Sequence, residues 1–492
     1  MKYNMVKIHS VIKFWARKSP TIISKLIPRG IKSLLDPFCG SGISGYVGVL
    51  KRVKRIVLSD INPVAIFITY TTLNKTILDE KIYIMIKKMC NNVAKEAYTF
   101  AFNGKRYIIE KVAWVTNYIC PHCEEVVDPR KARKPRAKFL ICPHCNRRFV
   151  SVDATEFFEE PFEIHAINRN GKKEIIRDPK ILKAYAEECK KIKIQSWFPD
   201  GEFVYPNGKP FLQHPHRIKK VSELFTERGL FAASTLYQHI EDIWVKDSEQ
   251  GDLLKLAFIS SIVSATKMLP YSSISGTSWK LPRYWITHVR FEKNFCNTFL
   301  RKLGILYKFK EMWYNRIKGY DIRVAYDSSY SFNLNDYTIN IIRCDVRKLD
   351  IDLKFDIIIM DPPHYAEINY YELTYLWQLW LKGRFNDKRF VDFNYWKYEL
   401  DVNPRLGRTL SYYIGEIAQV VHRYIEFLSD SGRLVLILHN SNKSALNETI
   451  NQIREYVGSL RYRRITTNIP SSAQGIHGKR KQSLYLLLIN KQ

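Results

Sequence analysis

An acid and two prolines follow an apolar run late in the chain. Asp361-Pro362-Pro363-His364 comes directly after residues 355–360, which are predicted to form a buried strand. The Asp361 carboxylate and the Pro362 carbonyl can each accept one N–H of an exocyclic amine. Such an amine is a poor nucleophile because its lone pair is delocalised into a base, and two well-placed acceptors draw the nitrogen towards sp3 geometry. The motif therefore suits transfer of a methyl group to the amine of a nucleobase.

The fourth position of this motif is expected to stack on the base once it is extruded from its helix. Histidine is a weaker stacking residue than tyrosine, so Tyr365 is a second candidate beside His364. Taken alone, Asp-Pro-Pro is explained at least as well by a strand that ends at two prolines. The motif therefore needs support from a second site. The candidate catalytic residues are Asp361, Pro362, Pro363, His364 and Tyr365.

A glycine-containing loop near the start of the chain provides that second site. Residues 31–35 are predicted to form a strand, which leads into residues 36–42 (DPFCGSG) and a helix that starts at Ile43. Gly40 and Gly42 let the backbone approach a ligand, and the helix N-terminus behind them favours a carboxylate such as that of a methionine moiety. A nicotinamide-binding loop would instead follow the pattern G-x-G-x-x-G, and here the third glycine is missing.

A second acidic position lies after the next apolar run, residues 56–58. Asp60 stands 20 residues after Gly40, where a carboxylate can hold ribose hydroxyls. S-adenosylmethionine fits both the loop and this acid, and an ordinary strand-to-helix turn without a cofactor is the alternative. The candidate cofactor-binding residues from these two loops are Asp36, Phe38, Gly40, Gly42, Asp60 and Asn62.

Two C-x2-C pairs, each with the sequence Cys-Pro-His-Cys, predict a metal site. Their separation is typical of zinc ribbons, and four thiolates satisfy one tetrahedral structural Zn²⁺. We interpret His122 and His144 as loop residues rather than ligands. Residues 130–138 (RKARKPRAK) lie between the pairs and suit phosphate contact, although a solvated charged loop would have the same composition. The candidate ligands are Cys120, Cys123, Cys142 and Cys145.

The composition favours a polyanionic partner. The 492 residues include 78 Lys and Arg against 48 Asp and Glu, a formal net charge of +30 that is spread along the chain. Nucleic acid is the first expectation for such a charge. No apolar stretch reaches the roughly eighteen residues of a spanning helix, and residues 1–17 lack the apolar core of a signal peptide. We therefore expect a cytoplasmic protein without a membrane segment, whose remaining cysteines are free thiols.

Strand and helix patterns at both ends of the chain predict one doubly wound, Rossmann-like α/β sheet. We expect residues 1–75 and 331–492 to form its two halves, and residues 76–330 to be an insertion that contains the zinc ribbon at about 118–148 and recognises the target. Strands are predicted at 31–35, 56–58, 337–342, 355–360, 433–438, 462–467 and 483–489, and helices at 230–245, 253–268, 411–427 and 445–456.

Together these motifs carry a family resemblance over most of the chain. The sequence resembles the zinc-ribbon-containing, site-specific DNA methyltransferases that act on adenine N6 or cytosine N4. The matching stretches are the cofactor loop with residues 60–63 (DINP), and also residues 14–20 (FWARKSP), 222–228 (SELFTER) and 372–377 (ELTYLW). The resemblance implies an S-adenosylmethionine methyltransferase sheet in which residues 14–20, including Trp15 and Lys18, close over the methionine end of the cofactor. The family usually has Tyr where this chain has His364.

The resemblance also implies roles that the residues alone leave open. Asp345 would bond the cofactor adenine, but an Asp that caps a turn is nearly as good an interpretation. Trp377 and Trp380, three residues apart on a predicted helix, are more often core than base-contacting. Adenine N6 in duplex DNA is the preferred target. An RNA amino-methyltransferase and a decayed, zinc-ribbon nucleic-acid-binding protein are the alternatives, and a nuclease partner of a restriction-modification system is left open.

Overall fold

The computed structural model describes residues 11–490 except 13, 16, 133–138, 212–217, 272–278, 280–282, 327–330, 366–367, 440–442, 459–460 and 469–480. The described residues form two compact units. The first, which we call the sheet unit, comprises residues 14–77 and 308–490. The second, the insert unit, comprises residues 11–12 and 78–307. The helix α10 (Phe295–Ile317) contains the boundary between them.

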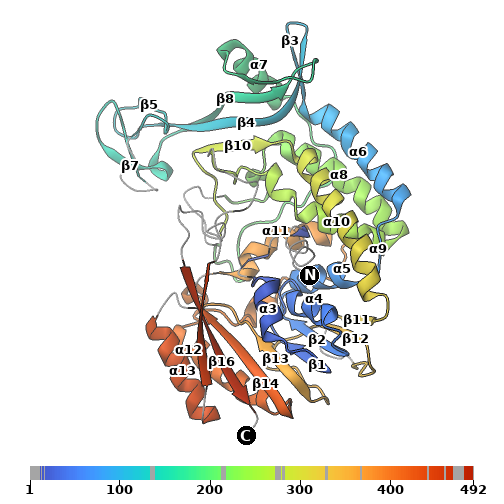
Figure 1. Cartoon of the computed structure of the whole chain (residues 1–492). Helices are drawn as coiled ribbons and strands as arrows, with labels where there is room; N and C mark the ends of the chain where they lie inside the picture. Colours follow the sequence, from blue (N-terminus) through green and yellow to red (C-terminus); the bar gives the residue numbers. More distant parts are fainter. Residues whose placement is uncertain are drawn as a thin grey trace. The chain divides into compact units, whose positions relative to one another are not determined.

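An eight-stranded sheet forms the centre of the sheet unit (Figure 1). Its strand order is β11-β12-β2-β1-β13-β14-β16-β15. The first six strands are parallel, and β16 is antiparallel to both of its neighbours. The sheet unit is therefore a mixed α/β structure with a mostly parallel sheet, which is consistent with a Rossmann-like arrangement. The strands are β1 (Ser33–Asp36), β2 (Arg55–Asp60), β11 (Asp321–Ala325), β12 (Thr338–Arg343), β13 (Phe355–Met360), β14 (Leu428–His439), β15 (Arg461–Asn468) and β16 (Lys481–Asn490).

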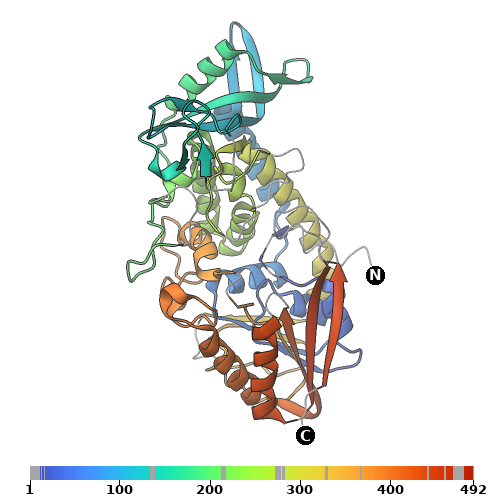
Figure 2. The ribbon, with the colours of Figure 1, turned by 90° about the vertical axis from the view of Figure 1, so that its left-hand side faces the viewer.

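Helices cover both faces of this sheet because its buried strands carry apolar side chains on both sides. On one face, a Cβ atom at Gly48 would meet the side chains of Leu34 and Ile56, so α4 packs directly on β1 and β2. On the other face, Leu35 and Ile358 belong to the core that α12 and α13 complete. Figures 1 and 2 show α12 and α13 side by side. The helices are α3 (Pro20–Leu26), α4 (Ile43–Leu50), α5 (Pro63–Leu73), α11 (Tyr370–Lys382), α12 (Leu410–Ile425) and α13 (Lys443–Val457).

An antiparallel sheet organises the insert unit. Its strand order is β10-β4-β8-β9, and β3 and β5 also pair with β4. None of the helices in the described ranges is long and apolar enough to cross a membrane. The strands are β3 (Thr99–Phe102), β4 (Lys105–Ile119), β5 (Val126–Val127), β8 (Phe157–Ile167), β9 (Lys173–Ile176) and β10 (Val289–Lys293). The helices are α6 (Glu80–Tyr98), α7 (Pro179–Lys190), α8 (Glu227–Lys246) and α9 (Ser248–Ile259).

Two predictions about these elements are wrong. The helix predicted to run to residue 268 ends at Ile259, because the hydroxyls of Ser260 and Ser261 bond the Ala257 carbonyl and offer the backbone an alternative to the helix. The predicted insertion to residue 330 is also too long. Strand β11 pairs in parallel with β12 and so belongs to the sheet, and its exposed, alternating pattern at this edge hid it in the sequence.

Candidate functional site

The strand order of the sheet reverses between β1 and β13. From β1 the chain passes to β2 and β12 on one side, and later to β13 and β14 on the other. The carboxyl ends of parallel strands leave a crevice at such a reversal, and ligands bind there. A pocket lies at this place, with about 960 Å³ of space that no atom fills, its open mouth included. Its walls come from the loops after β1, β2, β12 and β13, so the sheet gathers residues that are far apart in the sequence.

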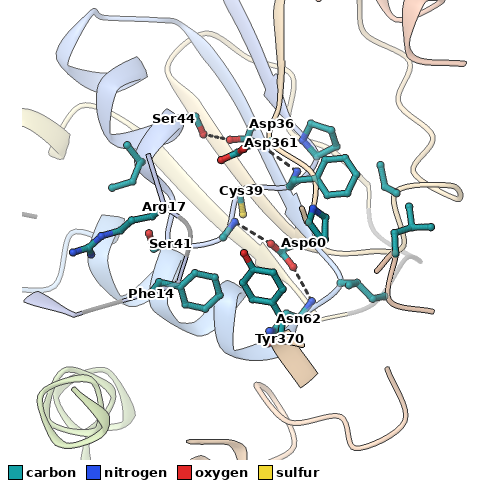
Figure 3. A pocket seen from close by; sticks show the side chains of 18 of the residues that line it. Phe14, Arg17, Asp36, Cys39, Ser41, Ser44, Asp60, Asn62, Asp361 and Tyr370 are labelled. Carbon is teal, nitrogen blue, oxygen red and sulfur yellow. Dashed lines mark hydrogen bonds between the residues drawn. The ribbon is translucent and has the colours of Figure 1, made fainter. Parts of the chain in front are cut away.

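Asp60 ties together the loops that follow β1 and β2 (Figure 3). Its carboxylate accepts the N–H of Gly40 and the N–H of Asn62, both at 2.9 Å. The Ile61 N–H is a third donor to this carboxylate, which has about four lone-pair sites, so a contact with a ribose hydroxyl is still chemically open to it. The Asn62 side chain caps α5 by accepting the Val64 N–H at 3.0 Å, and its contact with a cofactor stays a prediction. Both residues line the pocket.

Burial shifts the pKa values of the Asp36 and Asp60 carboxyl groups. Burial raises the pKa of Asp36 to about 7, although hydrogen bonds from the Ser44 hydroxyl and the Phe38 N–H offset part of this effect. Burial likewise raises the pKa of Asp60 to about 6. Figure 3 shows the carboxylates of Asp36 and Asp361 near one another, and their repulsion also raises the pKa of Asp36. A cation in the pocket would relieve this repulsion.

The two glycines of the first loop are needed for backbone geometry. Gly40 and Gly42 have φ values of 51° and 74°, which residues other than glycine rarely adopt. At Gly42 a Cβ atom would also lie 2.8 Å from Cγ2 of Thr69, whereas at Gly40 it would only touch Phe14 at 3.4 Å. The sequence predicted that these glycines make room for a ligand. The structure adds a second requirement, the left-handed backbone that turns the loop into α4.

The start of α4 offers hydrogen-bond donors that are not engaged by the loop. No side chain among the described residues caps this helix at Gly42, so its first N–H groups keep their capacity. Ser41 lines the pocket beside them, and only 5 % of its surface is exposed. Within the described residues its hydroxyl has no hydrogen-bond partner. A buried hydroxyl without a partner is costly, and a carboxylate placed here would satisfy it.

Asp361, Lys18 and His364 form a cluster at the end of β13, which we call the Lys18 cluster. The Lys18 ammonium lies 2.8 and 2.9 Å from the two oxygens of the Asp361 carboxylate and 3.0 Å from Nε2 of His364. Lys18 and His364 are buried, and Asp361 faces the pocket. Burial would raise the pKa of Asp361, but this pKa is held below its ordinary value, chiefly by the positive charge of the Lys18 ammonium. Asp361 is therefore an ionised hydrogen-bond acceptor at neutral pH.

The two residues expected to stack on a base do not line the pocket. His364 is buried against Lys18, and Tyr365 belongs to the hydrophobic core with only 7 % of its surface exposed. The Tyr365 ring packs edge-on against Tyr413, and its hydroxyl lies 3.4 Å from that of Thr449. The structure corrects our interpretation of Tyr365, because a ring inside the core cannot also face a base.

The two prolines after Asp361 differ in position. Pro363 lines the pocket, and its carbonyl accepts a hydrogen bond from the Tyr413 hydroxyl. Pro362 is buried, and no described residue donates to its carbonyl. The Pro362 carbonyl thus keeps the acceptor capacity that the sequence assigned to it. Its contact with an amine stays a prediction.

Aromatic residues from the N-terminal segment and α11 line one side of the pocket. The rings of Phe14 and Tyr370 stack with centroids 5.8 Å apart, and both residues line the pocket. Trp15 also lines it and lies 4.9 Å from Trp377. Trp377 and Trp380 are buried, as expected for core residues. Lys18 lines the pocket as well, and its ammonium bonds Asp361. Contact of Trp15 and Lys18 with a cofactor stays a prediction.

Asp345 follows β12 and lines the pocket, but its carboxylate is already engaged. It accepts the Arg347 N–H at 3.0 Å and also pairs with the Arg347 guanidinium, whose other arm bonds Glu416. This is the turn-capping alternative that the sequence left open. A bond from Asp345 to a cofactor adenine stays a prediction that would have to use its remaining lone pairs.

Several pocket residues carried no signal in the sequence. Tyr398, Glu399 and Leu400 come from an irregular segment between α11 and α12. Glu399 is buried, accepts the Tyr371 N–H at 3.2 Å, and has its pKa raised well above the ordinary value by burial and by neighbouring Asp401. No spacing rule links this segment to the loops after β1 and β13, so only the fold could bring it to the pocket.

The four predicted zinc ligands come together in the insert unit. Their sulfur atoms all lie within 4.8 Å of one another. The distances are 3.8 Å between Cys120 and Cys145 and 3.6 Å between Cys123 and Cys142. A tetrahedral Zn²⁺ with Zn–S bonds of about 2.3 Å places its sulfurs about 3.8 Å apart, so this cluster fits one metal ion such as zinc. All nine cysteines are free of disulfides.

The backbone has the same hydrogen-bonding pattern in both halves of the predicted zinc ribbon. Glu124 and Asn146 each follow the second cysteine of a pair, have positive φ, and return an N–H to the carbonyl of the first cysteine at 3.0 Å. His122 and His144 are exposed and lie outside the sulfur cluster, as predicted. Strands β6 (Phe139–Ile141) and β7 (Arg148–Val150) complete the second half. Of the basic segment, 130–132 are described and 133–138 lie outside the described residues.

One further stretch that carries the family resemblance has a structural role. Thr226 in residues 222–228 caps α8 by accepting the Gly229 N–H at 3.0 Å. Arg228 is buried and donates to the Ala97 carbonyl. These residues fix the start of a helix in the insert unit.

Comparison with known proteins does not assign the chain to a family. No protein-family model matches the chain, and no curated protein sequence matches it.

Proposed function

We propose that this protein is an S-adenosylmethionine-dependent methyltransferase that acts on an exocyclic amine of a nucleobase, with adenine N6 in DNA as the preferred target. One observation carries the proposal: the loop that starts at Asp36 and the loop that starts at Asp361 share one pocket at the reversal of the strand order. The first loop would hold the cofactor, and the second would act on the amine. The sheet would then be a Rossmann-like methyltransferase sheet in which β16 is the one reversed strand.

The charge of the pocket supports a sulfonium cofactor over a nicotinamide dinucleotide. Acidic residues outnumber basic ones in the lining of the pocket, where Asp36, Asp60, Asp345, Asp361 and Glu399 stand against Arg17 and Lys18. The Gly40 N–H, which a dinucleotide-binding loop would turn towards a pyrophosphate, donates to Asp60. Carboxylates repel a pyrophosphate and attract a sulfonium cation. The methionine carboxylate has a separate place at the Ser41 hydroxyl and the first turn of α4.

The residues at the end of β13 would prepare the amine for attack. When bound, S-adenosylmethionine supplies an electrophilic methyl group. The ionised Asp361 carboxylate would accept one N–H of the amine, and the Pro362 carbonyl would accept the other, which aims the nitrogen lone pair at that methyl group. Lys18 supports this step because its positive charge keeps Asp361 ionised.

A nucleic-acid substrate is supported by the charge of the chain and by the ribbon. The formal net charge of +30 suits phosphate contacts, which supply most of the sequence-independent affinity for nucleic acid. The four-cysteine cluster would hold a structural Zn²⁺ that fixes the ribbon as a rigid support for its basic loop. Duplex DNA is the partner that the family resemblance implies.

Methyl transfer can be tested with labelled S-adenosylmethionine and separate pools of duplex DNA and tRNA. Digestion to nucleosides then identifies the modified base. We expect label in N6-methyl-2'-deoxyadenosine from the DNA pool. Label in a tRNA nucleoside would replace DNA by RNA as the substrate, and label in neither pool would contradict the proposed function.

A further inference from the structure

We propose that the Lys18 cluster is a proton relay, in which His364 receives through Lys18 the proton that methylation releases. The proposal rests on the proposed function, since only a reaction at Asp361 delivers a proton there. It gives His364 a task that replaces stacking, and it gives Lys18 a task beyond the cofactor contact expected from the sequence.

The hydrogen bonds fix the starting protonation state of His364. An ammonium group has only donors, so the Lys18 Nζ atom, 3.0 Å from Nε2 of His364, must donate to it. Nε2 therefore carries a lone pair, and the imidazole is neutral with its proton on Nδ1. The same ammonium bonds both oxygens of Asp361 at 2.8 and 2.9 Å. One donor thus connects an acceptor in the pocket with an unprotonated, buried base.

Transfer of a methyl group to an amine leaves one proton too many at the nitrogen. The new N–C bond forms as the C–S bond breaks, the bonding electrons stay on sulfur as a neutral thioether, and the nitrogen becomes positively charged. The nearest acceptor is the Asp361 carboxylate, whose side chain is only 21 % exposed. Asp361 accepts a proton weakly, because Lys18 stabilises its ionised form. A second acceptor behind it would complete the reaction.

The relay moves one proton without changing the other groups. The amine proton passes to Asp361, Lys18 gives one of its protons to Nε2 of His364, and Asp361 returns its proton to Lys18. At the end the base carries a methylamino group, Asp361 is a carboxylate, Lys18 is an ammonium, and His364 is an imidazolium. The proton has left the nitrogen, and the pocket can again receive an amine.

The charges around His364 favour this end state. Nε2 lies 3.4 Å from Oδ1 of Asp361, so a protonated ring gains a partner of opposite charge at once. Lys18 on the other side opposes protonation. The balance suits a group that is neutral at rest and accepts a proton briefly.

Two conservative variants separate the relay from the support of Asp361. His364→Gln keeps an acceptor for Lys18 but cannot take a proton at neutral pH. Lys18→Arg keeps the positive charge on Asp361 but holds its own protons too tightly to pass them on. We expect each to lower the single-turnover methylation rate about 10²-fold, the low end of general base catalysis, while cofactor affinity stays within a few-fold. With S-adenosylmethionine held at a saturating concentration at every pH, we also expect the native rate to fall at acid pH as His364 becomes protonated, and this decline to be absent in His364→Gln.

The outcomes distinguish the relay from the function beneath it. If native protein methylates nucleic acid and His364→Gln keeps both the rate and the acid decline, the relay is wrong and the function stands. If native protein methylates no nucleic acid, both fall together. Nitrogen-15 NMR of labelled histidine tests the resting state without turnover, with His364→Gln to assign the signal. A neutral ring with a bare Nε2 supports the relay, and an imidazolium at pH 7.5 overturns it.

Discussion

The pocket and the zinc ribbon are held together by opposite means. Cys120 and Cys145, whose sulfurs approach to 3.8 Å, are 25 residues apart in the sequence, whereas Lys18 and Asp361 are 343 residues apart. The ribbon has a small core of its own, and its four thiols would be joined by one ion. The pocket instead lies on a large core and contains charges that burial has made unfavourable.

This difference indicates which kind of perturbation should affect each region. A local structure with a small core depends on its ion, because few apolar contacts replace the metal once it is lost. A pocket built from distant loops keeps its backbone when one ligand contact is removed, but its charges respond to pH and to ligand. Loss of the metal should therefore unfold the ribbon. Loss of a contact in the pocket should instead change ligand binding or catalysis and leave the backbone in place.

Loss of the metal should have the largest effect, and it should stay within the ribbon. Structural Zn²⁺ contributes about 10–16 kcal/mol of binding energy in small metal domains. We expect Cys142→Ser protein to lose its zinc and to gain hydrogen exchange in the ribbon, while the sheet unit keeps its protection. Elemental analysis and hydrogen-exchange mass spectrometry give the two readings. His144→Ala, an exposed neighbour in the same loop, should keep the metal, and unfolding of the sheet unit with the ribbon would break the comparison.

Removal of the Asp361 carboxylate should have the next largest effect, and only on chemistry. We expect Asp361→Ala to lower the single-turnover rate about 10²–10³-fold, as for loss of one preorganised electrostatic contact, with affinity for nucleic acid nearly unchanged. Asp361→Ala leaves the buried Lys18 ammonium without its carboxylate partner. The double variant Lys18→Met with Asp361→Ala removes both charges, so it shows whether a loss of rate comes from that buried charge alone. Asp352→Ala, at an exposed site before β13, should match native protein. A fully active Asp361→Ala protein would remove the catalytic assignment.

A methyl group at the turn into α4 should have an intermediate effect. Gly42→Ala forces a side chain into positive φ and towards Thr69, and we expect it to weaken cofactor binding and to lower the free energy of unfolding by about 1–3 kcal/mol. Gly30→Ala is the matched control, since Gly30 also has positive φ but open space around it. Equal losses in chemical denaturation would show that backbone strain alone matters and that the close fit to Thr69 does not.

Per pH unit, the pH dependence of cofactor binding should be the smallest of these effects. The pKa values of about 7 for Asp36 and about 6 for Asp60 lie above their ordinary value of 3.8. In the unliganded fold these groups favour the protonated form, so the stability they contribute is fully present below pH 3.8 and is lost as pH rises through 6 to 7. A bound cation favours the ionised form, so affinity should fall as pH drops from about 8 to about 5, by up to about tenfold per unit near these pKa values. Titrations across this range would contradict the expectation if the affinity were constant.

The parts of the molecule that could be predicted are those with local signals. The spacing of four cysteines predicts the four-sulfur cluster, and the apolar runs that lead to Asp36, Asp60 and Asp361 predict three adjacent strands of the sheet. Two C-x2-C pairs and a loop with Asp and glycine can be recognised in the sequence without information about the rest of the chain. The same holds for the free cysteines outside the ribbon.

The parts that escaped prediction depend on contacts across the sequence. The pairing of Lys18 with Asp361 spans 343 residues, and Glu399 reaches the pocket through an irregular segment. Tyr365 was misassigned because its position next to the motif says nothing about which way its ring turns, and a positive φ of 46° directs it into the core. Neighbourhood in sequence thus located the site but did not orient its side chains.

Calorimetric titration of S-adenosylmethionine into the purified protein tests the pocket most directly, with NAD⁺ as the comparison ligand. The carboxylates around Gly40 and the donors at Ser41 lead us to expect one equivalent of S-adenosylmethionine to bind, and NAD⁺ not to bind. Binding should also release protons from Asp36 and Asp60. Repeating the titration in buffers of different ionisation enthalpy measures this release. Binding of NAD⁺ with S-adenosylmethionine excluded, or no binding of either ligand, would contradict the proposed function.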